Sequence, residues 1–147
     1  MEDIVMTSST CEKNKALLHR WFEEVWDKGR AEAIDEMLAA EAVAHGLADE
    51  SGAPLRGPEG FKPFFHKFRE AFPDIEVNID DIITEGETVA ARCTVRGTHR
   101  GNSLGVEATQ QPVEFTGMTM LRVKDGQIAE AWNNFDFLKL FQQIGAM

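Results

Sequence analysis

The chain has 147 residues, a size typical of one domain, and 43% of them are hydrophobic while 27% are charged. Its 25 acidic and 15 basic side chains give a formal net charge of -10. That charge repels phosphate backbones and anionic lipid surfaces, so we expect neither a nucleic-acid nor a membrane partner. No apolar run reaches the roughly 20 residues that cross a bilayer. The acidic N-terminus also lacks the features of a signal peptide, so a cytoplasmic protein is expected.

We predict one domain over residues 1–147, with residues 1–8 frayed. Ser9 and Glu12 then have the spacing of a capping box. An apolar stripe at helical spacing follows and predicts a first helix that Gly29 ends. The stripe consists of Leu17, Leu18, Trp21, Phe22, Val25 and Trp26. Trp21 and Trp26 are large enough to close a hydrophobic cavity, although core packing alone also explains them.

A short second helix is predicted next, with Ile34, Met37 and Leu38 on one face. After it we expect an irregular stretch with a short strand near residues 42–45, and a loop rich in Gly and Pro through Gly57.

Pro58 suits the first turn of a third helix, and Pro73 ends that helix. Between them a stripe of phenylalanines recurs at helical spacing, namely Phe61, Phe64, Phe65, Phe68 and Phe72. Core packing is one interpretation of this stripe and contact with a ligand is another. The two agree if the helix covers a cavity.

From Ile75 the hydrophobic period changes to two, which predicts a strand. A turn at residues 84–87 joins it to a second alternating strand over residues 88–95. Asp81 breaks the alternation of the first strand, so either the strand bulges at residues 80–81 or this acid is functional. Cys93 lies in the second strand far from Cys11, and a buried thiol is expected there rather than a disulfide.

Residues 113–123 and 127–133 form a predicted hairpin. A three-residue loop with a bulge at Gly126 would pair Thr119 with Ala131 and Asn133 with Gly117, and would place both polar side chains on one face. Asp136 is predicted to cap a short last helix over residues 137–144. Helices followed by a run of strands indicate an α+β domain.

Several segments near the C-terminus resemble one known family. They are Gly97-Thr98-His99-Arg100-Gly101, the Asp125-Gly126 turn, Asp136 and Gln143-Ile144-Gly145. Their intervals are similar to those of the polyketide cyclases that close anthracycline rings, the nogalonic and aklanonic acid ester cyclases (SnoaL-like). The order of elements resembles the wider superfamily of ketosteroid isomerases and scytalone dehydratases. This implies a cone-shaped, curved sheet of antiparallel or mixed strands, with three N-terminal helices on its concave face and a short C-terminal helix.

The resemblance implies a cavity that binds a small hydrophobic ligand without a metal or cofactor. The four histidines are also too scattered to suggest a metal site. The positions that would hold the family's catalytic aspartate and histidine are Asn133 and Thr119 here. Neither side chain can act as a general acid or base, but both could bind a carbonyl or enolate oxygen.

His99 and His45 are the remaining candidates for moving a proton. His99 could instead be a loop histidine that pins a backbone carbonyl, whereas His45 falls where the superfamily often shapes the cavity mouth. His19 and His66 lie off the apolar stripes and are expected to be exposed. The expected ligand contacts are Trp21, Phe65, Phe68, Phe115 and Ala131. The superfamily's pairing through the outer sheet face predicts a homodimer, with Met118, Met120, Ile128 and Trp132 in the interface.

The first functional hypothesis is therefore a cyclase-type protein that binds an apolar, oxygenated ligand. Its chemistry would be an aldol-type cyclisation or a related isomerase or lyase step. An alternative is a non-catalytic binding or scaffold domain on the same fold, and a third hypothesis is another reaction in the same pocket, such as isomerisation, hydration or hydroxylation.

Overall fold

The computed structural model describes residues 8–147, and the expected frayed N-terminus falls outside that range except for Ser8, which begins the first helix. The helices are α1 (Ser8–Arg20), the π-helical segment η2 (Trp21–Asp27), α2 (Ala31–Met37), α3 (Gly57–Ala71) and α4 (Phe137–Gln143). The strands are β1 (Leu38–Ala48), β2 (Pro54–Arg56), β3 (Glu76–Glu85), β4 (Thr88–Thr98), β5 (Pro112–Lys124) and β6 (Gln127–Phe135).

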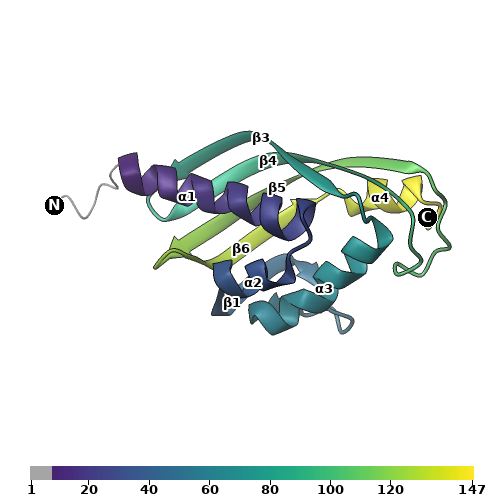
Figure 1. Ribbon diagram of the computed structural model, residues 1–147, viewed down its shortest axis with the longest axis horizontal. Helices are drawn as coiled ribbons and strands as arrows, with labels where there is room; N and C mark the ends of the chain where they lie inside the picture. Colours follow the sequence, from purple (N-terminus) through teal and green to yellow (C-terminus); the bar gives the residue numbers. More distant parts are fainter. Residues whose placement is uncertain (1–7) are drawn as a thin grey trace.

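One sheet carries all of these strands in the order β2-β1-β6-β5-β4-β3. The β1–β6 pair is parallel and the other pairs are antiparallel, so the sheet is mixed. The sheet curves without closing, and α1, α2 and α3 cover its concave side (Figure 1). The expected α+β class is confirmed. Within residues 8–147, no helix is both long and apolar enough to cross a membrane.

The first helix runs on from α1 into η2 and ends before Gly29, as predicted, because Gly29 adopts a φ of 69°. The π winding is visible in the bond from the Lys28 N–H to the Glu23 carbonyl, at 2.9 Å. This segment buries Trp21, Phe22, Val25 and Trp26. The Arg69 guanidinium donates to the Trp26 carbonyl at 3.0 Å and so fastens the end of η2 to α3.

The region between the second and third helices differs from the expectation. The sequence predicts a strand over residues 42–45, but β1 spans eleven residues and begins at Leu38, which the periodicity assigns to the preceding helix. The expected loop before Gly57 also contains the short strand β2. Pairing with β6 on one side and β2 on the other extends β1, and such long-range pairing leaves no local pattern in the sequence.

The third helix and the middle strands follow the prediction closely. Phe61, Phe65 and Phe68 are buried along α3, and Phe64 is half-buried. Strand β3 bulges where Asp81 interrupts the alternation, because Ile79 pairs with Cys93 while Asp81 pairs with Arg92. Asp81 is exposed, which confirms the bulge.

The predicted pairing register of the last hairpin is wrong. Lys124 pairs with Gln127, so the loop has two residues, Asp125 and Gly126, with φ values of 53° and 77°. Positive φ at both positions is typical of a type I′ turn, whose twist suits a hairpin better than the predicted three-residue loop. The bulge lies instead at Ala129, between the Val123–Ile128 and Arg122–Glu130 pairs.

This displaced bulge has two consequences for the sheet faces. Thr119 lies directly opposite Asn133, rather than opposite Ala131, so the two polar side chains share a face as expected. Ile128, which is predicted to face outward, is 1% exposed and points to the core. A two-residue loop would have split Thr119 and Asn133 across the sheet if the bulge had not restored the alternation.

The C-terminal helix α4 is capped as predicted, because the Asp136 carboxylate accepts a hydrogen bond from the Lys139 N–H at 3.0 Å. Gln143 then docks this helix on β5. Its amide donates to the Glu114 carbonyl and accepts from the Glu114 N–H, both at 2.9 Å. The end of the chain thereby closes one end of the sheet (Figure 1).

Burial raises the pKa of the Cys93 thiol to about 12. At pH 8 only about one thiol in ten thousand would be ionised at such a pKa, and the thiolate is the reactive form. We therefore expect iodoacetamide at pH 8 to alkylate the half-buried Cys11 but not Cys93 in the folded protein. Peptide mass spectrometry checks this, with urea-unfolded protein as the control in which both thiols react. Equal labelling of both thiols in the folded state would contradict it.

Candidate functional site

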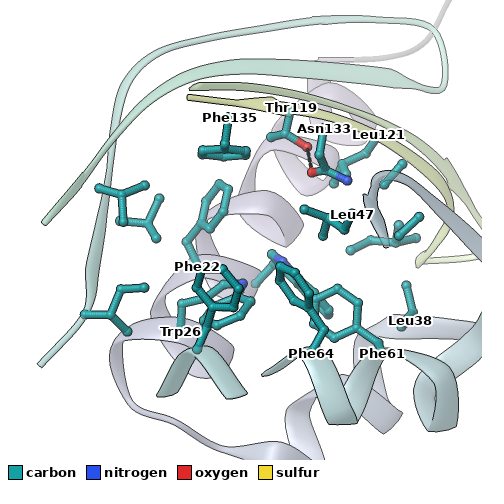
Figure 2. Close-up of a pocket in the computed structure, with 18 of the residues that line it drawn as sticks. Phe22, Trp26, Leu38, Leu47, Phe61, Phe64, Thr119, Leu121, Asn133 and Phe135 are labelled. Carbon is teal, nitrogen blue, oxygen red and sulfur yellow. Dashed lines mark hydrogen bonds between the residues drawn. The ribbon is translucent and has the colours of Figure 1, made fainter. Parts of the chain in front are cut away.

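A cavity of about 80 Å³ lies between the helices and the concave face of the sheet (Figure 2). Aromatic rings form much of its wall. They are Trp21, Phe22, Trp26, Phe61, Phe64, Phe68, Phe115, Phe135 and Phe137. The helix side is held together by ring contacts, such as the edge-on contact of Trp21 with Phe61 at 5.1 Å between centroids. This wall is apolar.

Two polar side chains face this aromatic wall from the sheet, Thr119 on β5 and Asn133 on β6 (Figure 2). The Thr119 hydroxyl donates to the Asn133 Oδ1 at 2.9 Å. The Asn133 Nδ2 donates to the backbone carbonyl of His45 on β1, also at 2.9 Å. Thr119 is only 4% exposed and Asn133 is half-buried, so the hydrogen bond between them is partly shielded from water.

No titratable side chain of residues 8–147 lines the cavity. Hydroxyl and carboxamide groups hold hydrogen bonds but do not exchange protons near neutral pH. Among the described residues, the site can therefore orient a polar ligand group, while it contains no general acid or base of its own.

His45 lies on the other side of the sheet from the cavity. Its Nε2 is 2.7 Å from the Glu130 Oε2, and its ring stacks on Trp132 at 5.6 Å between centroids. The hydrogen bond from His45, followed by that from Arg122, holds the pKa of the Glu130 carboxyl below its usual range. The His45 side chain does not line the cavity, and only its backbone carbonyl reaches the site.

His99 is 0% exposed and is also not a lining residue. Its Nδ1 accepts from the Thr109 N–H at 3.2 Å, and its backbone pairs with Gln110 and Gln111. The ring therefore holds the segment that follows β4 in place, but it does so by accepting from a backbone N–H and not, as expected for a loop histidine, by pinning a backbone carbonyl. His19 and His66 are exposed, as predicted.

Four of the five predicted ligand contacts line the cavity and one does not. Trp21, Phe68, Phe115 and Ala131 line the cavity, whereas Phe65 packs behind it against Trp26. Sequence reasoning missed several lining residues, among them Phe135, Phe137 and Leu47.

A signal for Phe135 exists in Gly117, its cross-strand partner. A Cβ at Gly117 would overlap the Phe135 ring, so this glycine makes room for the ring over β5. A glycine opposite an aromatic residue in a buried hairpin is therefore the sequence feature that marks this ring. Within residues 8–147, no group of three or more His, Cys, Asp or Glu side chains is placed to hold a metal ion.

A close backbone approach positions Asn133. Gly46 on β1 has a φ of 83°, and a Cβ on it would overlap the Asn133 carbonyl oxygen. Only glycine combines this positive φ with so near a neighbour. The β1–β6 junction thus brings the His45 carbonyl within reach of the Asn133 amide.

The model of the SnoaL-like polyketide cyclase family matches residues 16–144. The aklanonic acid methyl ester cyclase DnrD of Streptomyces peucetius is 29% identical over 130 residues, which cover 87% of this chain and 88% of the relative.

Solved structures give the same relationship. IdmH from Streptomyces antibioticus, a proposed polyketide cyclase, matches with a TM-score of 0.78 and 33% identity over 90% of this chain and 98% of its own. A proposed SnoaL-like cyclase from Jannaschia sp. CCS1 matches with a TM-score of 0.82 and 25% identity, covering 97% of this chain and 98% of its own. The chain belongs to the SnoaL-like polyketide cyclase family.

The Gly46→Ala substitution should destabilise the protein through the crowding at Asn133. Gly105→Ala is the matched control, because Gly105 has the same φ of 83° but no neighbour within 4 Å of the point that its Cβ would occupy. We expect Gly46→Ala to lower the free energy of unfolding by at least ~2 kcal/mol more than Gly105→Ala. Urea denaturation measures both values, and equal losses would contradict the role given to this contact.

Proposed function

We propose that this member of the SnoaL-like polyketide cyclase family binds a neutral, apolar, oxygenated small molecule in the cavity between its helices and sheet. The observation that carries the proposal is the composition of the cavity wall, which is aromatic and aliphatic apart from Thr119 and Asn133. Apolar pockets with a few placed polar groups are typical of small-molecule sites. A charged ligand would lose its hydration there without gaining a counter-ion.

The volume limits how a ligand enters. Ligand pockets commonly measure ~300–1,000 Å³, whereas this cavity measures about 80 Å³. A multi-ring ligand therefore requires part of the aromatic wall to move outward. The half-buried Phe64 on α3 is the lining ring that we expect to move first, because it is less enclosed than Phe61 and Phe68.

The chemistry that suits this cavity is an aldol-type cyclisation or a related isomerase or lyase step without a cofactor. DnrD, by its name, acts on aklanonic acid methyl ester. The resemblance assigns the family's acid and base positions to Asn133 and Thr119, which cannot transfer protons. In this chain the proton would have to move through a group on the substrate or through water, while the pair orients the reacting oxygen.

The absence of titratable side chains from the lining within residues 8–147 favours a second candidate function. In that case the protein binds the same class of ligand without converting it. His45 and His99 keep structural roles under this alternative, through Glu130 and Thr109.

We also propose that the protein acts in the cytoplasm as a homodimer formed through the outer sheet face. Met118 and Met120 on β5 are 59% and 41% exposed on that face, beside the half-buried Trp132. Exposed apolar side chains that adjoin on a sheet are typical of a contact surface. Ile128, which was expected in this interface, belongs to the cavity wall instead.

The Asn133→Asp substitution separates the two candidate functions. It should create cyclisation of aklanonic acid methyl ester if the pocket is catalytic and lacks only its acid–base group. Product formation followed by chromatography and mass spectrometry is the measurement. Asn134→Asp is the matched control, because Asn134 is exposed on the same strand and should remain inactive. Ligand binding without turnover in Asn133→Asp would favour the binding protein.

The new carboxyl group in Asn133→Asp should have a raised pKa, because one of its oxygens would face the His45 carbonyl where Nδ2 now donates at 2.9 Å. A raised pKa means that the folded state holds the proton more tightly than the unfolded state. The free energy of unfolding of the variant should therefore fall as pH rises from about 3.9, the usual value for aspartate, through the raised pKa. Urea titrations across pH test this. A constant difference from Asn134→Asp would contradict it.

The dimer is tested by Met118→Glu with Met120→Glu. The double variant should elute as a monomer in size-exclusion chromatography with light scattering, because buried unpaired carboxylates oppose association. Ile83→Glu is the control, since Ile83 is 68% exposed on the edge strand β3 and away from the proposed interface. A wild-type monomer at micromolar concentration would overturn the proposal.

A further inference from the structure

The direction of each hydrogen bond at the Thr119–Asn133 pair follows from one fixed group, the backbone carbonyl of His45. A carbonyl oxygen only accepts, so the end of the Asn133 amide that lies 2.9 Å from it must be the nitrogen. The opposite end is then Oδ1, which also only accepts. The Thr119 hydroxyl, 2.9 Å from Oδ1, must therefore give its proton to Asn133.

This polarity decides what the pair can offer to a ligand. The only proton of the Thr119 hydroxyl is committed to Oδ1, so its oxygen presents lone pairs and acts as an acceptor. The Asn133 Nδ2 has two N–H groups, and the His45 carbonyl uses one of them. The second N–H has no acceptor among the hydrogen bonds of residues 8–147. The pair thus has one free acceptor, the Thr119 oxygen, and one free donor, the second N–H of Asn133.

We infer that the Thr119–Asn133 pair selects a ligand hydroxyl, as in an enol or phenol, over a ketone, an aldehyde or an oxyanion. A hydroxyl can donate to the Thr119 oxygen and accept from the Asn133 Nδ2 at the same time. A carbonyl oxygen can use only the Nδ2 donor. This inference rests on the proposed function, since it concerns the ligand of the same cavity, and it names the polar group that the ligand must carry.

Binding a carbonyl or an oxyanion at the Thr119–Asn133 pair costs more free energy than binding a hydroxyl. A carbonyl could bind Thr119 only if the hydroxyl turned its proton away from Oδ1, which would leave a buried acceptor unpaired. An oxyanion would meet the lone pairs of Thr119 without a compensating proton. The pair therefore differs from an oxyanion hole, in which every group donates. For a ligand that interconverts between keto and enol forms, this site favours the neutral enol.

Three monocyclic probes test the inference on the wild-type protein: phenol, benzaldehyde and toluene. They are similar in size, and they carry a hydroxyl, an acceptor-only carbonyl and no polar group, respectively. Because one extra hydrogen bond is worth about 1 kcal/mol, phenol should bind about fivefold more tightly than benzaldehyde. Isothermal titration calorimetry measures the dissociation constants.

Two variants at Thr119 locate the effect. Thr119→Val removes the acceptor with little change of shape, and it should abolish the preference for phenol over benzaldehyde. Thr119→Ser keeps the hydroxyl and should retain the preference. If Thr119→Val does not fold, the wild-type ratio together with Thr119→Ser still decides the question.

The outcomes separate the two proposals. If none of the probes binds, the cavity is not a small-molecule site, and both the proposed function and this inference fail. If the probes bind but benzaldehyde equals or exceeds phenol in the wild-type protein, the proposed function stands and the inference is overturned. The inference is also overturned if Thr119→Val keeps the full preference for phenol, because another group would then accept the hydrogen bond from the phenol hydroxyl.

Discussion

The site depends on the junction where β1 runs parallel to β6. Gly46 lets the two backbones approach closely at the Asn133 carbonyl. The Asn133 side chain then donates a hydrogen bond to the His45 carbonyl at 2.9 Å. Without this approach, Asn133 would lose the group that fixes its orientation, and Thr119 would lose a defined direction for its proton. The chemistry of the pocket is thus set by backbone geometry on a strand that contributes no polar side chain to the cavity.

A second constraint is the bulge at Ala129, because it decides which side chains reach the cavity. Before the bulge, the side chain of Ile128 faces the cavity. After the bulge, the side chains of Ala131 and Asn133 face the cavity. Those of Glu130 and Trp132 face outward and contact the His45 side chain. The hairpin therefore sorts its residues into an apolar inner face with a single polar pair and an outer face with charged and aromatic groups. The two-residue turn and the bulge together place Thr119 and Asn133 on the same face of the sheet, which the turn alone would not do.

Sequence reasoning succeeded where the determinant is local. The phenylalanine stripe of α3, the bulge at Asp81 and the cap at Asp136 all follow from periodicity or from short-range hydrogen bonding. It failed where pairing between distant segments decides, as in the length of β1. The π winding of η2 was equally hidden, because an apolar stripe is compatible with either type of helix. The site was predicted in part for the same reason: its polar pair lies on one hairpin, whereas its orienting carbonyl comes from β1.

The carboxamide of Asn133 suits these constraints better than a carboxyl group at the same position would. A carboxylate there would be partly desolvated and would place an acceptor against the His45 carbonyl, and both effects destabilise the charged form. A carboxamide satisfies both neighbours at once, since it donates to His45 and accepts from Thr119. The pocket is consequently stable without a buried charge. Thr119 and Asn133 carry no proton-transfer group, so what they present to the cavity is a fixed direction of hydrogen bonds.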